Sequence, residues 1–230
     1  MDLVKIIKVV DGDTVHVQII GSTYPISSST KMNTILVIRL RGIDTPELAQ
    51  EWGTASKNWL ANTLEINKDK ILLSREIQPD RYGRTLGSLF VVDLKEGIPV
   101  IKDIQLEMIR NGHAWWYKTY NKNPHYKKAM ELAVNKNIGL WADEKTVAPW
   151  EFRRLSRFSN KLRKQYKEKK INFKQVLEQI SDQIIKDVDN VKKSEVDKIV
   201  AETISIETIN DSKLSFLHNI FDSYFNILPN

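Results

Sequence analysis

Two arginines and two carboxylates are crowded into the nine residues from Arg39 to Glu47. Apolar residues alternate with others from Thr34 to Arg41, which predicts a strand whose two arginines leave the same side. Asp44 and Glu47 follow on a turn that a proline stiffens by fixing one backbone angle. Such a cluster has two interpretations. It is either a solvated group of surface ion pairs or a site that binds a metal ion and a phosphate together.

Two other turns contain residue types that suit the same chemistry. In Asp11-Gly12-Asp13 the glycine is expected to supply a positive φ, and the aspartates either cap backbone amides or offer carboxylates to a cation. The second turn, residues 78–84, ends in Arg84. A solvated side chain is the default interpretation of that arginine, and phosphate binding is the alternative.

The elements that must position these residues follow from hydrophobic periodicity and turn residues. Strands are predicted over residues 3–10, 14–20, 34–41, 70–77 and 84–92, and helices around residues 54–66, 101–109 and 126–133. Residues 21–33 are predicted to form a long loop. Five strands with three helices favour an α+β fold, a five-stranded OB-fold β-barrel with three packed α-helices, and that fold suits nucleic-acid binding.

An aromatic run with a lysine, His113 to Tyr120, follows the second predicted helix. Aromatic side chains can stack on the bases of a single strand, and each stacked base contributes about 1–3 kcal/mol. The alternative is that most of these rings cover the end of the barrel. Tyr117 and Lys118 are the residues of this run predicted to contact nucleic acid.

Composition limits the classes of protein to which the chain can belong. It has 230 residues, 41% of them hydrophobic, a net charge of +6 and no cysteine. No apolar run approaches 18 residues, so no membrane span is predicted. We expect a cytoplasmic protein if Met1 is the native start, and a secreted one if a signal peptide has been removed.

Charge is distributed unevenly along the chain. Residues 153–170 contain nine Lys and Arg and a single acid, whereas residues 171–230 contain six basic and ten acidic residues. We therefore predict a domain over residues 1–152 and a C-terminal extension over residues 153–230, basic at first and then amphipathic and helical. For the extension, phosphate contacts with nucleic acid and a solvated helix face are alternatives, as are a protein-partner surface and packing on the barrel.

Taken in order, three clusters resemble the staphylococcal (micrococcal) nuclease family, also known as thermonuclease-like domains. They are Asp11-Gly12-Asp13-Thr14, Arg39 through Glu47, and Arg81-Tyr82-Gly83-Arg84. The resemblance covers roughly residues 3–152. It implies an OB-fold endonuclease that uses Ca²⁺ to hydrolyse phosphodiester bonds in DNA and RNA with low sequence selectivity.

The resemblance also implies a role for individual residues. Asp13 and Asp44 would be carboxylate ligands of Ca²⁺, the backbone carbonyl of Thr45 a further ligand, and Asp11 would act through water. All of these are oxygen donors, which a hard divalent cation prefers.

Three catalytic roles complete the implied site. Glu47 would be the general base or would organise the attacking water. Arg39 and Arg84 would bind the phosphate, because planar guanidinium groups suit the charge that gathers on its equatorial oxygens.

Other residues are predicted to contact the nucleic acid outside the chemical centre: Arg41, Arg81, Tyr82, Tyr117 and Lys118. Arg41 lacks the family spacing and is assigned to DNA contact or a surface ion pair. The alternative function is a non-catalytic OB-fold module that binds nucleic acid or acts as a scaffold, because one fold can serve both purposes.

Overall fold

The computed structural model describes residues 1–22, 32–80, 82–143, 146–187 and 196. The chain divides into two compact units, residues 1–143 and 144–230. Most of the predicted loop over residues 21–33, and Arg81, lie outside the described residues.

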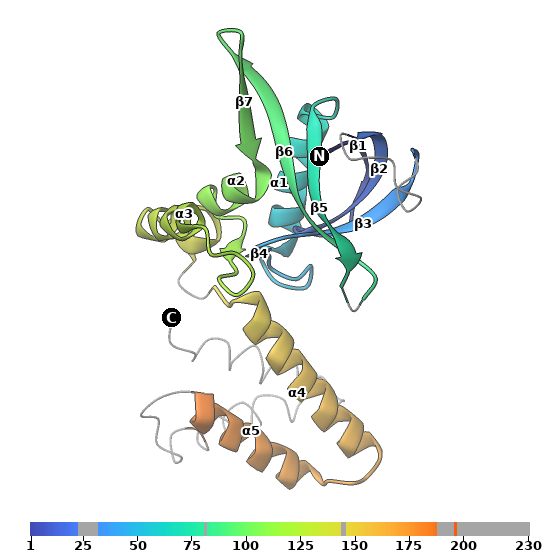
Figure 1. The fold of residues 1–230 in the computed structure, drawn as a ribbon. Coiled ribbons are helices and arrows are strands. Elements are labelled where there is room, and N and C mark those ends of the chain that lie inside the picture. Colours follow the sequence, from blue (N-terminus) through green and yellow to red (C-terminus); the bar gives the residue numbers. More distant parts are fainter. Residues whose placement is uncertain (23–31, 81, 144–145, 188–195, 197–230) are drawn as a thin grey trace. The chain divides into compact units, whose positions relative to one another are not determined.

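The first unit is built on one large, mainly antiparallel sheet (Figure 1). Within the described residues the sheet has six strands in the order β3-β2-β1-β5-β6-β7, and an additional parallel pairing of β3 with β6 joins the first five of them into a ring. The strands are β1 Asp2–Val9, β2 Thr14–Ser22, β3 Ile35–Leu40, β5 Ile71–Pro79, β6 Thr85–Lys95 and β7 Ile98–Asp103.

The sixth strand corrects the prediction of five. β6 and β7 form a hairpin that extends beyond the rest of the sheet (Figure 1). The sequence pattern placed Ile101 in a helix, but Ile101 pairs with Val92 in β7. The second helix begins only at Ile104, because the side chain of Asp103 accepts the N–H of Leu106 and caps it.

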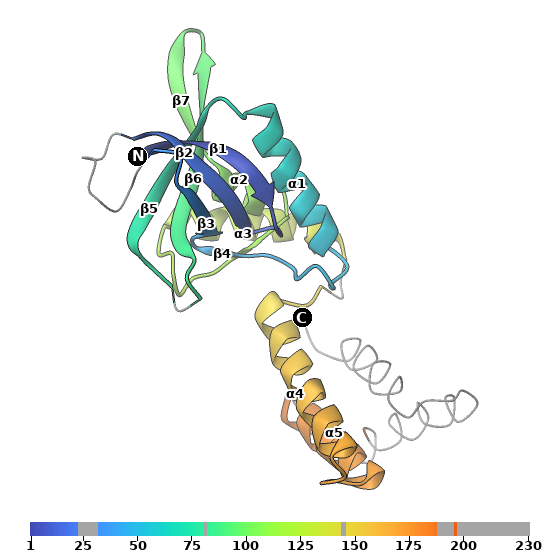
Figure 2. The same cartoon turned by 90° about the vertical axis from the view of Figure 1, so that its right-hand side faces the viewer.

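The first unit contains three α-helices, as predicted. They are α1 Gly53–Ile66, α2 Ile104–Arg110 and α3 Pro124–Asn135, and a 3-10 helix η1 follows at Gly139–Ala142. Helices α1 and α2 pack on the sheet, and α3 packs on α2. Figure 2 shows α1 beside β1. Two short strands that the sequence did not reveal, β4 Ile43–Asp44 and β8 Trp115–Trp116, pair with each other.

A continuous core holds the ring and the helices together. Val17 of β2, Ile38 of β3, Leu89 of β6, Leu60 of α1 and Met108 of α2 are all fully buried members of it. Burying each such side chain contributes about 1.5–3 kcal/mol. The strands that hold the polar site are therefore fixed by apolar packing on their other residues.

The second unit contains a pair of helices, α4 Pro149–Lys167 and α5 Phe173–Asp187. Their contact includes an ion pair of 2.8 Å between Arg154 and Asp187. The domain boundary predicted after Phe152 falls within α4. Among the described residues, no helix is long and apolar enough to cross a membrane.

Candidate metal and phosphate site

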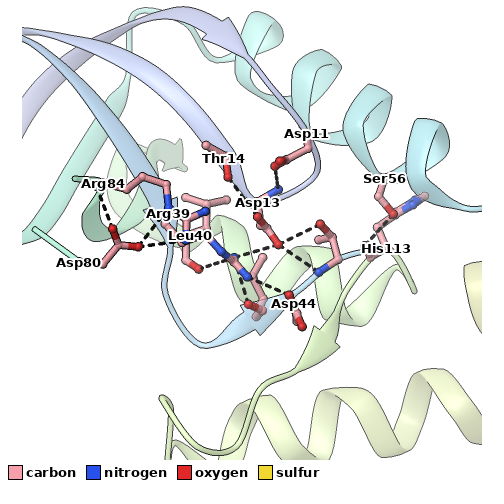
Figure 3. A network of polar contacts seen from close by, with 12 residues as sticks. Asp11, Asp13, Thr14, Arg39, Leu40, Asp44, Ser56, Asp80, Arg84 and His113 are labelled. Carbon is pink, nitrogen blue, oxygen red and sulfur yellow. Dashed lines mark hydrogen bonds and ion pairs between the residues drawn. The ribbon is translucent and has the colours of Figure 1, made fainter. Parts of the chain in front are cut away.

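Arg39 on β3 lies between two buried carboxylates (Figure 3). Its Nη1 is 2.8 Å from Oδ2 of Asp13, and its Nη2 is 2.8 Å from Oδ1 of Asp44. Nη1 also donates to the backbone carbonyls of Leu40 and Ile43. The structure thus brings Asp13, from the turn before β2, to Arg39 and Asp44, which already lie close together in the sequence.

Asp13 accepts hydrogen bonds from several directions. Oδ2 accepts from both the backbone N–H and the hydroxyl of Thr45, at 3.1 and 3.0 Å, and Oδ1 accepts from the hydroxyl of Thr14 at 3.2 Å. The backbone carbonyl of Asp13 accepts the N–H of Leu40. Asp13 and Thr45 are therefore locked to each other, although 32 residues separate them in the chain.

The electrostatics of this cluster are dominated by burial. The pKa of the Asp13 carboxyl is raised to about 7, chiefly by loss of hydration; the carboxylates of Asp11 and Asp44 also raise it, and the charge of Arg39 opposes them. One guanidinium thus does not balance the crowded carboxylates. A divalent cation would offset the excess of negative charge.

The residues present fit such a cation in type. Asp13, Asp44 and the backbone carbonyl of Thr45 offer only oxygen atoms, the donors that Ca²⁺ prefers. Within the described part of the chain, no group of three or more His, Cys, Asp or Glu side chains could hold a metal ion by itself. Ca²⁺ takes about 6–8 oxygen ligands, so water and a substrate phosphate would have to complete its shell.

The structure of the turn before β2 explains the structural role of Gly12. Its φ is not positive, so the predicted reason for the glycine is wrong. A Cβ built at Gly12 would lie only 2.7 Å from Oγ1 of Thr45, so the glycine is needed for close approach of the turn to that residue. Asp11 accepts the N–H of Asp13 at 3.0 Å, which is the capping role considered for it.

Glu47 lies in the segment between β4 and α1 and is partly exposed. Its backbone N–H donates to Oε1 of Gln50, and its carbonyl accepts the N–H of Gln50. A Cβ at Gly53 would lie 2.0 Å from that carbonyl, so the first residue of α1 must be glycine for the helix to approach so closely. Neither Gln50 nor Gly53 was singled out from the sequence, and both position the backbone of Glu47.

Arg84 precedes β6 and is held by a residue that the sequence analysis missed, Asp80 (Figure 3). Oδ2 of Asp80 accepts from Nε and Nη2 of Arg84 at 3.1 and 3.0 Å. Oδ1 accepts the backbone N–H groups of Tyr82 and Arg84, both at 2.9 Å. Asp80 therefore fixes both the turn and one edge of the guanidinium.

The spacing alone could have indicated Asp80, because an aspartate at the start of a tight turn commonly accepts backbone N–H groups further along it. Desolvation opposes ionisation of Asp80, but the hydrogen bonds from the backbone and side chain of Arg84 and from Tyr82 outweigh it and lower the pKa of the carboxyl. Asp80 thus stays charged when it meets Arg84.

Arg41 follows the end of β3 and does not join the cluster. Its Nη1 is 3.0 Å from Oε1 of Glu76, and its side chain is 52% exposed, against 14% for Arg39. The two arginines therefore occupy different environments two residues apart. The surface ion pair is one of the two alternatives given for Arg41, and its contact with DNA stays a prediction.

The aromatic run divides between packing and exposure. Trp115 is buried and pairs with Asp44 across β8 and β4, so it supports the cluster structurally. The N–H of Tyr117 donates to the carbonyl of Gly42, and its ring meets that of Tyr120 edge to face. Lys118 is exposed.

The exposed Tyr82 lies on the turn that precedes β6. The residue is 67% exposed, and the guanidinium carbon of Arg84 lies 5.5 Å from the centre of its ring. Arg81, the remaining residue predicted to contact nucleic acid, lies outside the described residues.

Comparison with known proteins identifies the family. Residues 37–143 match the family model described as staphylococcal nuclease homologue. The chain is 34% identical over 155 residues to an uncharacterized endonuclease of Haemophilus influenzae, covering 67% of this chain and 75% of that protein. Asp11 and Asp13 precede the segment matched by the family model.

Plant relatives match over a smaller share of their length. A probable staphylococcal-like nuclease of rice, CAN3, is 37% identical over 120 residues, covering 52% of this chain and 29% of the rice protein. The staphylococcal-like nuclease CAN1 of Arabidopsis thaliana is 32% identical over 153 residues, covering 65% of this chain and 44% of the plant protein. The chain belongs to the staphylococcal nuclease family, a family of nucleases that hydrolyse phosphodiester bonds.

Proposed function

We propose that the protein is a Ca²⁺-dependent endonuclease that hydrolyses phosphodiester bonds in DNA and RNA with low sequence selectivity. The observation that carries the proposal is the buried fork of Arg39 between Asp13 and Asp44. It combines oxygen donors for a cation with a guanidinium for a phosphate. We also infer that the five-strand ring is an OB-type barrel, in keeping with nucleic-acid binding.

Asp13, Asp44 and the carbonyl of Thr45 would hold the Ca²⁺, with Asp11 acting through water. The bound ion would withdraw charge from the phosphoryl group and lower the pKa of nearby water. The network around Asp13 keeps its carboxylate in place through Thr14 and Thr45, so these donors are oriented before the substrate arrives.

Both arginines retain a donor for a phosphate. Among the described residues, no acceptor receives a hydrogen bond from the Nε–H of Arg39. Asp80 accepts from Nε and Nη2 of Arg84, and no described acceptor receives a hydrogen bond from its Nη1 group. Fixed guanidinium donors can stabilise the charge that develops on the phosphoryl oxygens in the transition state, without reorganisation at that moment. Removing one such donor typically costs about 3–4 kcal/mol of transition-state stabilisation.

Glu47 is assigned the role of proton acceptor or organiser of the attacking water. Its segment is anchored at the backbone by Gln50 and by the close approach of Gly53. General bases of this kind contribute about 10²–10⁴ to the rate. Tyr82, Tyr117, Lys118 and Arg41 would contact flanking nucleotides, since each lies at least partly exposed.

A cleavage assay on circular single-stranded DNA tests the proposal. The full chain should linearise and then degrade the circle in Ca²⁺ and leave it intact in EDTA, and an RNA substrate should behave in the same way. A circle is used because it has no end at which an exonuclease could start. The matched control is the variant Asp44→Asn, which keeps the side-chain shape but removes the charge.

Intact circles in both Ca²⁺ and EDTA would contradict the proposal. Retention of DNA without cleavage, with or without Ca²⁺, would instead favour a non-catalytic binding module. Equal cleavage by the Asp44→Asn variant would exclude the assigned metal ligand.

A further inference from the structure

Helix α4 in the second unit has one buried face. Leu155, Ser159 and Leu162 are buried and recur at the spacing of one helix face. On α5, Val176, Ile180 and Ile184 form a similar buried row. Apolar side chains are thus removed from solvent on this face of α4.

The other face of α4 is basic and exposed. Arg157, Lys161 and Lys164 are all exposed and recur at four and three residues, so they form one row. A rotation of about 100° per residue places this row on the side of the helix opposite to the buried row. Three further exposed lysines continue the charge beyond it: Lys167, Lys169 and Lys170.

Few of the acidic residues that the structure describes neutralise this basic face. Glu168 contacts Lys164 at 3.9 Å and Lys170 at 2.8 Å. Within the described residues, Arg157, Lys161 and Lys167 form no ion pair. Arg154 differs, because it binds both Glu151 and Asp187 and so joins α4 to α5. Cations kept so close repel one another, and a polyanion would offset that cost.

We propose that the basic face of α4 binds the phosphate backbone of nucleic acid as a second contact surface of this nuclease. That the polyanion is nucleic acid rests on the proposed function. The row from Arg157 to Lys164 spans about 10 Å at about 1.5 Å per residue. One strand of a DNA duplex places about three phosphates along that length of the duplex axis. An anionic membrane fits less well, because helices that lie on membranes insert an apolar face, and that of α4 is buried.

The consequence for the enzyme follows from the covalent link between the two units. A strand held on α4 stays at a high effective concentration near the unit that cleaves it. The surface should therefore lower the substrate concentration needed for cleavage and leave the rate at saturating substrate unchanged.

A binding experiment with the full chain in EDTA separates this surface from the chemistry. The triple variant Arg157→Gln, Lys161→Gln, Lys164→Gln should bind a fluorescein-labelled single-stranded DNA at least about tenfold more weakly at about 50 mM salt. The slope of log K against log salt should decrease in magnitude by about 2, since each phosphate contact on a single strand contributes about 0.7.

The matched control removes the same charge from exposed positions on and after α3: Lys127→Gln, Lys128→Gln, Lys136→Gln. It should change both the affinity and the slope much less. The charge-retaining variant Arg157→Lys, Lys161→Arg, Lys164→Arg should bind like the wild type. Equal losses in the two glutamine variants, or a loss in the charge-retaining variant, would overturn the proposal.

Two more outcomes distinguish this inference from its alternatives. If the α4 glutamine variant loses binding to phosphatidylserine vesicles but keeps its DNA affinity, the surface serves a membrane and the inference is wrong. Because the binding assay needs no cleavage, an α4-dependent affinity without any nuclease activity would support the inference and refute the proposed function. If the protein cleaves DNA but the α4 glutamine variant binds it with unchanged affinity, the proposed function is supported and the inference is refuted.

Discussion

The two arginines assigned to the phosphate are held by aspartates in opposite ways. Arg39 binds acids from two other elements, and its side chain is 14% exposed, whereas Arg84 binds Asp80 four residues away in one turn and is 31% exposed. The first pairing exists only when β3, β4 and the turn before β2 are assembled. The second can form from local sequence. Stability should therefore depend on the first arginine and activity on both.

The largest effect is expected from Arg39→Ala in the metal-free protein. It leaves the buried carboxylates of Asp13 and Asp44 without their cation, and breaking a buried pair in this way costs about 3–5 kcal/mol. Arg84→Ala breaks a partly exposed pair and should cost within about 1 kcal/mol. Urea unfolding measures both free energies of unfolding.

Adding Ca²⁺ sharpens the same comparison. It should restore part of the stability of Arg39→Ala, because a bound cation replaces the missing charge and binds only the folded state. It should increase the stability of the Arg84→Ala variant by no more than it increases that of the wild type. Equal destabilisation by the two substitutions would refute the distinction between a tertiary and a local pairing.

The second prediction concerns cleavage. Glu47→Ala and Arg84→Ala should each lower kcat about 10²–10³-fold, and Arg84→Lys should recover little, because lysine offers no planar pair of donors. Arg41→Ala should lower it less than about tenfold, since Arg41 is exposed and pairs with Glu76. Steady-state kinetics on a labelled oligonucleotide measure all four. Comparable losses at Arg41 and Arg84 would show that the assignment of Arg41 is wrong.

The third prediction follows from the raised pKa of Asp13, which is about 7 in the folded chain against 3.8 ordinarily. The folded state then holds this proton more tightly than the unfolded state. The metal-free protein should therefore lose stability as the pH rises from about 4 to about 7. A cation needs the ionised carboxylate, so the apparent Kd for Ca²⁺ should weaken by up to about tenfold per pH unit below about 7.

Thermal melts with and without Ca²⁺ at about pH 8 and about pH 6 test this linkage. The increase in Tm that Ca²⁺ causes should be larger at the higher pH. Asp13→Asn should remove the dependence of metal-free stability on this titration. A Ca²⁺-induced shift that is the same at both values would argue against Asp13 as a ligand.

The sequence predicted the strands and helices well where a single buried face imposed a period. Ile38 and Leu40 of β3 are buried as the alternation requires, and α1 and α3 are found where apolar spacing placed them. The hairpin of β6 and β7 was missed because its apolar residues Leu94, Ile98 and Ile101 are exposed, so their spacing reports no core. The pairing of β4 with β8 joins strands of two residues each, too short for any periodicity.

For the candidate site, the sequence supplied the residue types but not their partners. Asp13 is distant in sequence from Arg39 and Asp44, and spacing alone does not show that these segments come together in the fold. Alternation predicted that Arg41 leaves the same side of the strand as Arg39. However, β3 ends at Leu40, and alternation does not apply beyond the end of a strand. Gly12 approaches the side chain of Thr45 and Gly53 approaches the backbone of Glu47, and close approaches of this kind appear only in the folded chain.

The smallest predicted effect tests whether Asp80 acts through Arg84. In Asp80→Asn the remaining oxygen can still accept the N–H groups of Tyr82 and Arg84, so the turn is kept, but the acceptor for the guanidinium is lost. Loss of this contact should lower kcat about fivefold, equivalent to about 1 kcal/mol. The affinity for Ca²⁺ should not change, because Asp80 pairs with Arg84 and not with Arg39 and its two aspartates.

A double-mutant cycle decides between positioning and general destabilisation. In an Arg84→Ala background, Asp80→Asn should have no further effect on kcat, because the side chain that Asp80 orients is already absent. A fivefold loss that persists in that background would mean that Asp80 supports the fold of the turn and does not position the guanidinium. The local pairing would then be structural like the buried one, and the contrast between the two arginines would rest on exposure alone.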